Sequence, residues 1–110
     1  MDPEQGIYVS NLSTSDWESD PEVGGLMHVL CSVGRIQAGL SRFDQVDGPV
    51  TWTLPQREVF LILEGRARIE VADAPSLDLQ AGDMASLPKG AATTWYLTTP
   101  FREFWVLGPE

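Results

Sequence analysis

The chain alternates short apolar segments with breaks that contain glycine or proline, a pattern typical of β-strands joined by turns. In residues 66–71 charged and apolar side chains alternate, which predicts a strand with one face in water. Residues 59–63 are apolar at every position, which predicts a strand covered on both faces. No stretch shows a convincing helical period. We therefore predict an all-β protein.

Further strands are predicted where β-branched, aromatic or alternating residues recur. These strands cover residues 26–31, 35–42, 50–54, 77–79, 84–87, 93–98 and 102–107. Residues 1–25 are polar and acidic, with Trp17 as their one large anchor and a short predicted strand at 7–9. We expect residues 1–25 to form an N-terminal arm packed on the outside of a domain made by residues 26–110.

Two short motifs frame the centre of the chain. Residues 58–65 run from a glutamate through six residues to a glycine, and residues 82–90 place a glycine, five residues, a proline, one residue and a glycine. This order and spacing resemble the end of the first cupin motif and the start of the second. Residues 93–95 and 102–106 are most similar to small single-domain, RmlC-like cupins grouped with the ureidoglycine aminohydrolase cupin domain.

The resemblance implies a cupin jelly roll, the double-stranded β-helix barrel. With a period of two, Glu58, Phe60 and Ile62 share one strand face, and the resemblance places that face inside the barrel. A single barrel covers only its inner face, so the outer face of residues 59–63 needs the arm or a second subunit. This face, with His28 and Cys31 in an apolar strand near the arm, predicts a homodimer.

The resemblance also shows a departure at the metal site. Cupin metal sites use two histidines before the glutamate and a third after the second motif. Those places here hold Trp52 and Leu54, or Thr51 and Thr53, and then Thr93. Since only Glu58 of the ligand set is present, we expect no metal and no other cofactor.

A candidate site can still be assembled on the inner face. Burial in an apolar barrel raises the pKa of a carboxyl toward the range of a general acid or base, so Glu58 is the candidate catalytic residue. Trp52, Thr93, Trp95 and Phe60 are the candidate substrate-binding residues, because indoles beside one polar anchor are typical of small-molecule sites. The alternative is a structural Glu58 bonded to Arg35, Arg57 or a threonine, with the tryptophans filling the core.

Other reactive side chains are interpreted structurally. His28 and Cys31 lie three apart on a predicted strand, which sends them to opposite faces, so they cannot easily share a metal. Neither is interpreted as catalytic. Arg102, Glu103 and Lys89 are interpreted as solvated charges at the rim.

Composition narrows the class of partner. The 110 residues form one domain with a net charge of −9, which argues against nucleic acid and anionic membranes because both recruit clustered Lys and Arg. A single cysteine and no leader or spanning segment lead us to expect a cytoplasmic protein.

Three functions stay open. The first is a metal-independent cupin that binds a small organic molecule, as a binding module or as an isomerase, cyclase or lyase using Glu58 as acid or base. The second is a metal-dependent enzyme of the ureidoglycine aminohydrolase type. The third is a non-catalytic sensory or structural dimer, because a fold does not fix a function.

Overall fold

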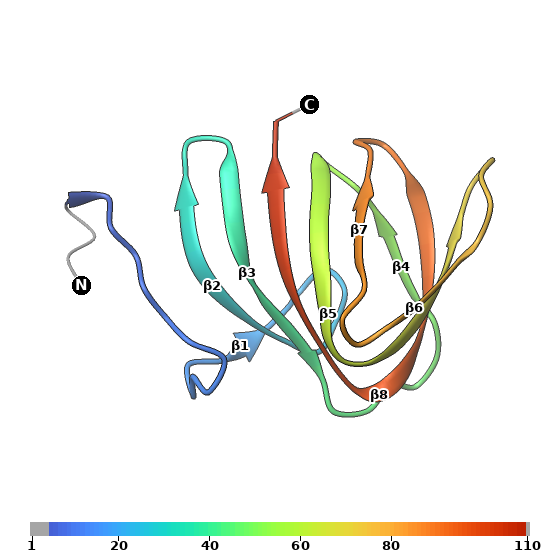
Figure 1. Cartoon of the computed structure of the whole chain (residues 1–110), viewed down its shortest axis with the longest axis horizontal. Helices are drawn as coiled ribbons and strands as arrows, with labels where there is room; N and C mark the ends of the chain where they lie inside the picture. Colours follow the sequence, from blue (N-terminus) through green and yellow to red (C-terminus); the bar gives the residue numbers. More distant parts are fainter. Residues whose placement is uncertain (1–4, 110) are drawn as a thin grey trace.

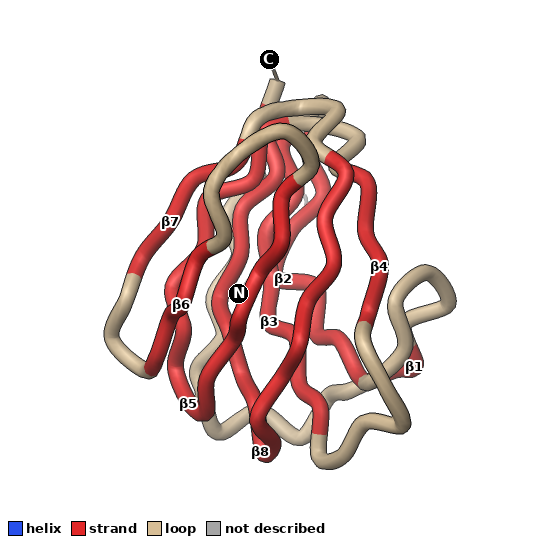
Figure 2. The backbone as a smooth tube through the Cα atoms, turned by 90° about the vertical axis from the view of Figure 1, so that its right-hand side faces the viewer, coloured by secondary structure: helices blue, strands red, loops and turns tan. Residues whose placement is uncertain are grey.

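The structure is a computed structural model that describes residues 5–109. It is built of antiparallel strands, and those residues contain no α-helix (Figures 1 and 2). The strands are β1 Glu18–Ser19, β2 Leu26–Val33, β3 Ile36–Phe43, β4 Val50–Thr53, β5 Arg57–Val71, β6 Leu77–Gln80, β7 Met84–Leu87 and β8 Ala92–Gly108. The all-β prediction is confirmed. No membrane-spanning helix occurs among residues 5–109.

The two long strands β5 and β8 pair with each other and form the centre of the molecule. The first half of β5 and the second half of β8 belong to one leaf, with β7, β3, β2 and β1. The other halves form a second leaf with β4 and β6. The β5–β8 register shifts around Glu64, and Gly65 has a φ of 83°. The bend at this point lets the leaves face each other, and Figure 1 shows β5 and β8 curving from one leaf to the other.

The long strands correct part of the prediction. Residues 59–63 and 66–71 were expected as separate strands, as were 93–98 and 102–107, but each pair is one continuous bent strand. In β5 the register shifts around Glu64 interrupt the pairing with β8 locally, and the pairing resumes beyond the bend. The predicted strand at residues 7–9 is also wrong, because no regular structure occurs there.

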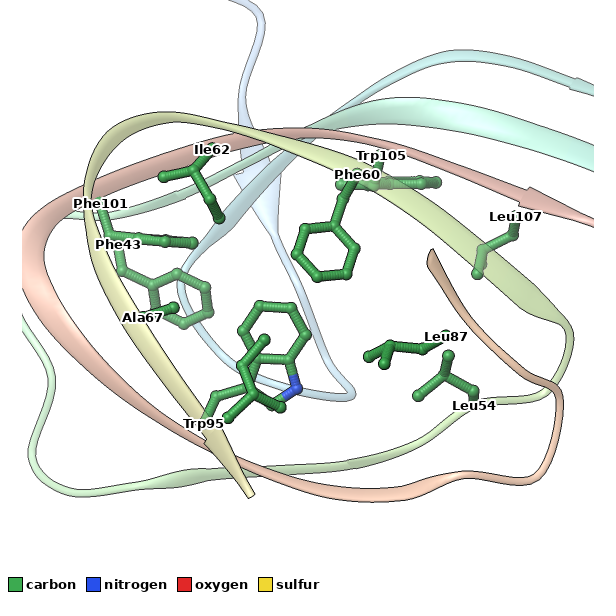
Figure 3. Close-up of a cluster of buried hydrophobic side chains, with 11 residues drawn as sticks. Phe43, Leu54, Phe60, Ile62, Ala67, Leu87, Trp95, Phe101, Trp105 and Leu107 are labelled. Atoms are coloured by element: carbon green, nitrogen blue, oxygen red, sulfur yellow. The ribbon is translucent and has the colours of Figure 1, made fainter. Parts of the chain in front are cut away.

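The core lies between the two leaves (Figure 3). Its most deeply buried side chains come from both leaves, with Phe60 of the first leaf 1% exposed and Ile69 of the second leaf 0% exposed. Because strand side chains alternate, β5 sends Glu58, Phe60 and Ile62 to this interior. The predicted inner face of β5 is therefore confirmed.

Residues 10–17 are held by side chains from the sheet. The ring nitrogens of buried His28 lie 2.8 Å from Asp16 O and 2.8 Å from Ser10 Oγ. Trp17 lies under the Arg42 and Arg102 guanidiniums, at 5.6 and 5.9 Å from its ring centroid. These contacts agree with a packed role for His28. The division into 1–25 and 26–110 stays a prediction, since β1 already pairs with β2.

Candidate functional site

A cavity of about 180 Å³ lies inside the barrel between the two leaves. Residues 20–23, before β2, form part of its wall, and the strands supply the rest. Its polar and tryptophan lining residues on the strands are Gln37, Ser41, Trp52, Glu58, Trp95, Glu103 and Trp105. A cavity of this volume suits a small ligand.

Glu58 is a buried carboxyl on this cavity. It is 5% exposed, and its Oε1 has no hydrogen-bond partner among the described residues. Burial raises the pKa of Glu58 from 4.5 to about 7, while a hydrogen bond with the Trp52 side chain lowers it in part. A carboxyl of this pKa is present in both its charged and neutral forms near neutral pH, as acid–base chemistry requires.

Glu103 is a second buried carboxyl, which the sequence interpretation missed. It is 6% exposed rather than a solvated rim charge, and its Oε2 also lacks a partner in residues 5–109. Burial raises the pKa of Glu103 well above its usual value, and the negative charge of Glu58 raises it further. The sequence contains a pattern that predicts this burial. Glu103 lies between Phe101 and Trp105 on the same face of β8, just as Glu58 shares one face of β5 with Phe60 and Ile62.

Three tryptophans form apolar walls of the cavity. Trp52 comes from β4, and Trp95 and Trp105 come from the two halves of β8. Trp105 Nε1 is buried without a hydrogen-bond partner in the described chain. Sequence analysis proposed Trp52 and Trp95, and the structure brings both to the same cavity as Glu58.

Thr93 and Phe60, the other two predicted binding residues, do not line the cavity. The Thr93 hydroxyl donates to Trp52 O and accepts the indole N–H of Trp95 at 2.9 Å. Thr93 therefore ties the Trp95 indole to the backbone of β4. Phe60 lies in the core with its ring centroid 5.1 Å from that of Trp95, so it supports the wall from behind.

The remaining charged candidates lie away from the cavity lining. Arg102 is half-buried and donates to Leu12 O, so it holds the chain before β2 and is not a solvated rim charge. Lys89 is exposed, and Cys31 is a half-buried free thiol. Arg57 donates to Ser86 Oγ at 2.7 Å.

Comparison with known proteins identifies the family. Residues 39–104 match the EutQ-like cupin domain, which is more than half of the 110-residue chain. The chain belongs to the EutQ-like cupin domain family. This membership confirms the jelly-roll prediction. It does not confirm the finer resemblance to the ureidoglycine aminohydrolase cupin domain.

Several solved cupins share the fold. An ethanolamine utilization protein Q from Salmonella typhimurium has a TM-score of 0.77 and 22% identity, over 96% of this chain and 89% of that chain. An RmlC-like cupin from Shewanella frigidimarina has a TM-score of 0.72 and 19% identity, over 92% and 89% of the two chains. The Clostridium difficile EutQ protein has a TM-score of 0.65 and 20% identity, over 82% and 71%. No curated protein matches this chain in sequence.

The cavity of this cupin does not offer the donors of a metal site. Trp52 and Leu54 are the inward pair on and after β4, while Thr51 and Thr53 are exposed. No group of three or more His, Cys, Asp or Glu in residues 5–109 is placed to hold an ion. Divalent ions need four or more ligands in most protein sites. The described residues therefore do not fit the histidine-rich metal site of other cupins.

Proposed function

We propose that this cupin binds a small organic molecule in its barrel cavity without a metal ion, with Glu58 as the anchoring acid or base. One observation carries the proposal: the buried Glu58 carboxyl, with an unpartnered Oε1, faces a cavity walled by tryptophans. Leaving a buried acceptor unpaired costs about 1–3 kcal/mol. A ligand that donates to this oxygen would recover that cost on binding.

Glu58 also supports a chemical role at this site. A pKa of about 7 lets the group accept a proton from one ligand atom and return it to another at neutral pH. Isomerase, cyclase and lyase reactions need such transfers and no oxidant or reductant. The same carboxyl would serve a non-catalytic binding module as a hydrogen-bonding anchor, and turnover of a bound compound separates the two roles.

The test is a fragment screen read by nuclear magnetic resonance of the four indole N–H groups. A cavity ligand should move the signals of Trp52, Trp95 and Trp105 but not that of Trp17, which lies outside and serves as an internal control. Glu58→Gln should weaken binding about 10-fold or more, because charge-assisted hydrogen bonds contribute roughly 1.5–3 kcal/mol. Glu64→Gln, on the exposed side of β5, is the matched control.

Two results would contradict the proposal. Equal ligand affinity in parent and Glu58→Gln would return Glu58 to a structural role. About one metal ion per purified chain, lost in Glu58→Gln, would instead favour the metal-dependent enzyme of the ureidoglycine aminohydrolase type.

We also propose that the protein is a homodimer. Val59 is 48% exposed on the outer face of β5, and Leu61 and Leu63 are half-exposed beside it. Buried His28 is occupied by residues before β2, so β5 supplies the stronger argument. Sedimentation at micromolar concentration should give a dimer mass, and Val59→Lys should shift it toward the monomer. A monomeric parent would contradict the dimer and leave the cavity proposal intact.

A further inference from the structure

The cavity is acidic without compensation from basic residues. Its charged lining residues are Glu58 and Glu103 inside and Asp20 and Glu22 before β2. Among residues 5–109, no Lys, Arg or His lines it. In their carboxylate forms these groups attract a cation and repel an anion, and both effects are strong in a poorly hydrated site.

The two inner carboxyls also present free acceptors. Glu58 Oε1 and Glu103 Oε2 are both without partners, on side chains that are 5% and 6% exposed. An ammonium group carries up to three N–H donors and no acceptor. Its bonds to carboxylates are charge-assisted and stronger than neutral ones. A protonated amine can therefore satisfy atoms that a hydrocarbon would leave unpaired.

The walls favour the same ligand. Trp52, Trp95 and Trp105 line the cavity, and an indole is the aromatic side chain that attracts a cation most strongly over its face. Ser41 pairs with Glu103 across the β3–β8 ladder and adds a hydroxyl beside that carboxyl. Two carboxylates and indole faces provide too few oxygen ligands for a divalent metal, but they match an organic cation.

We propose that the ligand of the cavity is a small organic ammonium ion, a protonated amine on a short apolar group, held between Glu58 and Glu103 and against the indole walls. The inference rests on the proposed function, since it concerns the same cavity. It adds the charge and chemical class of the molecule that binds there.

Binding should release protons. Burial raises the pKa of both carboxyls, so the free site holds protons at neutral pH, and an ammonium ion would favour the carboxylate forms. The groups that bear on Glu58 are Glu103 from β8 and Asp20 and Glu22 before β2, while β3, β4 and β7 add no ionisable side chain to the lining. An alkylamine stays protonated below about pH 9, so its affinity should fall as pH drops below about 7.

The test compares n-butylammonium with neutral 1-butanol and anionic butyrate, which have similar size and different charge. The first should shift the Trp52, Trp95 and Trp105 indole signals, leave Trp17 unchanged and bind at least about 10-fold tighter than 1-butanol. Butyrate should not bind. Titration calorimetry at about pH 7 in phosphate and in PIPES, which differ in ionisation heat, should show up to one proton released per ligand.

Matched variants test whether Glu58 and Glu103 hold the ammonium group. Glu58→Gln and Glu103→Gln should each weaken n-butylammonium at least about 10-fold and reduce the proton release, whereas Glu64→Gln should change neither. Unchanged stability curves for Glu64→Gln and a retained set of four indole signals in all variants show that the proteins remain folded.

The outcomes separate the inference from the proposed function. If 1-butanol or butyrate binds the cavity as tightly as n-butylammonium, the ligand class is wrong while small-molecule binding stands. If n-butylammonium binds with the same heat in phosphate and in PIPES, the expectation that binding releases protons is wrong. If no screened compound moves the cavity indoles, both the inference and the proposed function fail.

Discussion

Glu58→Gln is expected to make the folded protein more stable than the parent at about pH 8 by about 3 kcal/mol. Burial raises the pKa of Glu58 from 4.5 to about 7, and each pKa unit corresponds to about 1.4 kcal/mol. The folded state holds this proton more tightly than the unfolded state. The stability due to Glu58 is therefore full below about pH 4.5 and is lost as pH rises to about 7.

Urea unfolding and thermal unfolding of the parent and variant at about pH 5 and pH 8 check this expectation. The difference should be near its maximum at pH 8, on the order of 10 °C in thermal midpoint, and should be small at pH 5. Glu103 remains in the variant and its raised pKa gives a dependence of the same sign, so the variant should keep part of the parent's decline. Glu64→Gln should follow the parent. A Glu58→Gln variant less stable than the parent at pH 8 would contradict the pKa assignment.

The loss of folding stability caused by the ionised Glu58 carboxylate bears on the function of this residue. A single domain is stable by only about 5–15 kcal/mol, so a group that removes about 3 kcal/mol at neutral to alkaline pH does not serve stability. The barrel places Glu103 in the same apolar cavity, where its charge is also unfavourable. Two such carboxyls in one core are better explained by what they bind than by what they stabilise.

The inner face of β5 could be predicted from sequence because the signal is local. Alternation places Glu58, Phe60 and Ile62 on one face, and the spacing within residues 58–65 and 82–90 resembles that of the cupin motifs. Glu103 obeys the same alternation between Phe101 and Trp105. It was missed because its neighbour Arg102 suggested an exposed pair, although Arg102 in fact points to the other side and holds residues before β2.

Other features depend on contacts that no local pattern encodes. The Thr93 hydroxyl joins Trp52 and Trp95 from neighbouring strands, so its positioning role follows only from the β4–β8 register. Trp17 meets Arg42 and Arg102 from strands far along the chain. The continuity of β5 and β8 through their bends likewise follows from mutual pairing and not from the residues at the bend alone.

Gly65→Ala is expected to lower the free energy of unfolding by about 3 kcal/mol or more. Gly65 lies where β5 bends between the leaves, with a φ of 83° that favours glycine. A Cβ there would come within 2.5 Å of the backbone oxygens of both Thr98 and Pro100. Since these atoms belong to the paired strand β8, they cannot move aside as a side-chain end can, and the two leaves would be forced apart.

Gly82→Ala is the matched control for Gly65→Ala. Gly82 also has a positive φ, 96°, but a Cβ there would meet nothing within 4 Å. Only the backbone conformation is penalised, which costs about 1–2 kcal/mol. Urea unfolding should show a larger loss of stability for Gly65→Ala than for Gly82→Ala, because only the first variant adds a steric clash with β8. Equal losses in the two variants would show that backbone conformation alone governs both sites.

The bend at Gly65 sets how the leaves enclose the cavity. The folded fraction of Gly65→Ala should therefore also show displaced indole signals for Trp52, Trp95 and Trp105, while Gly82→Ala retains the parent pattern.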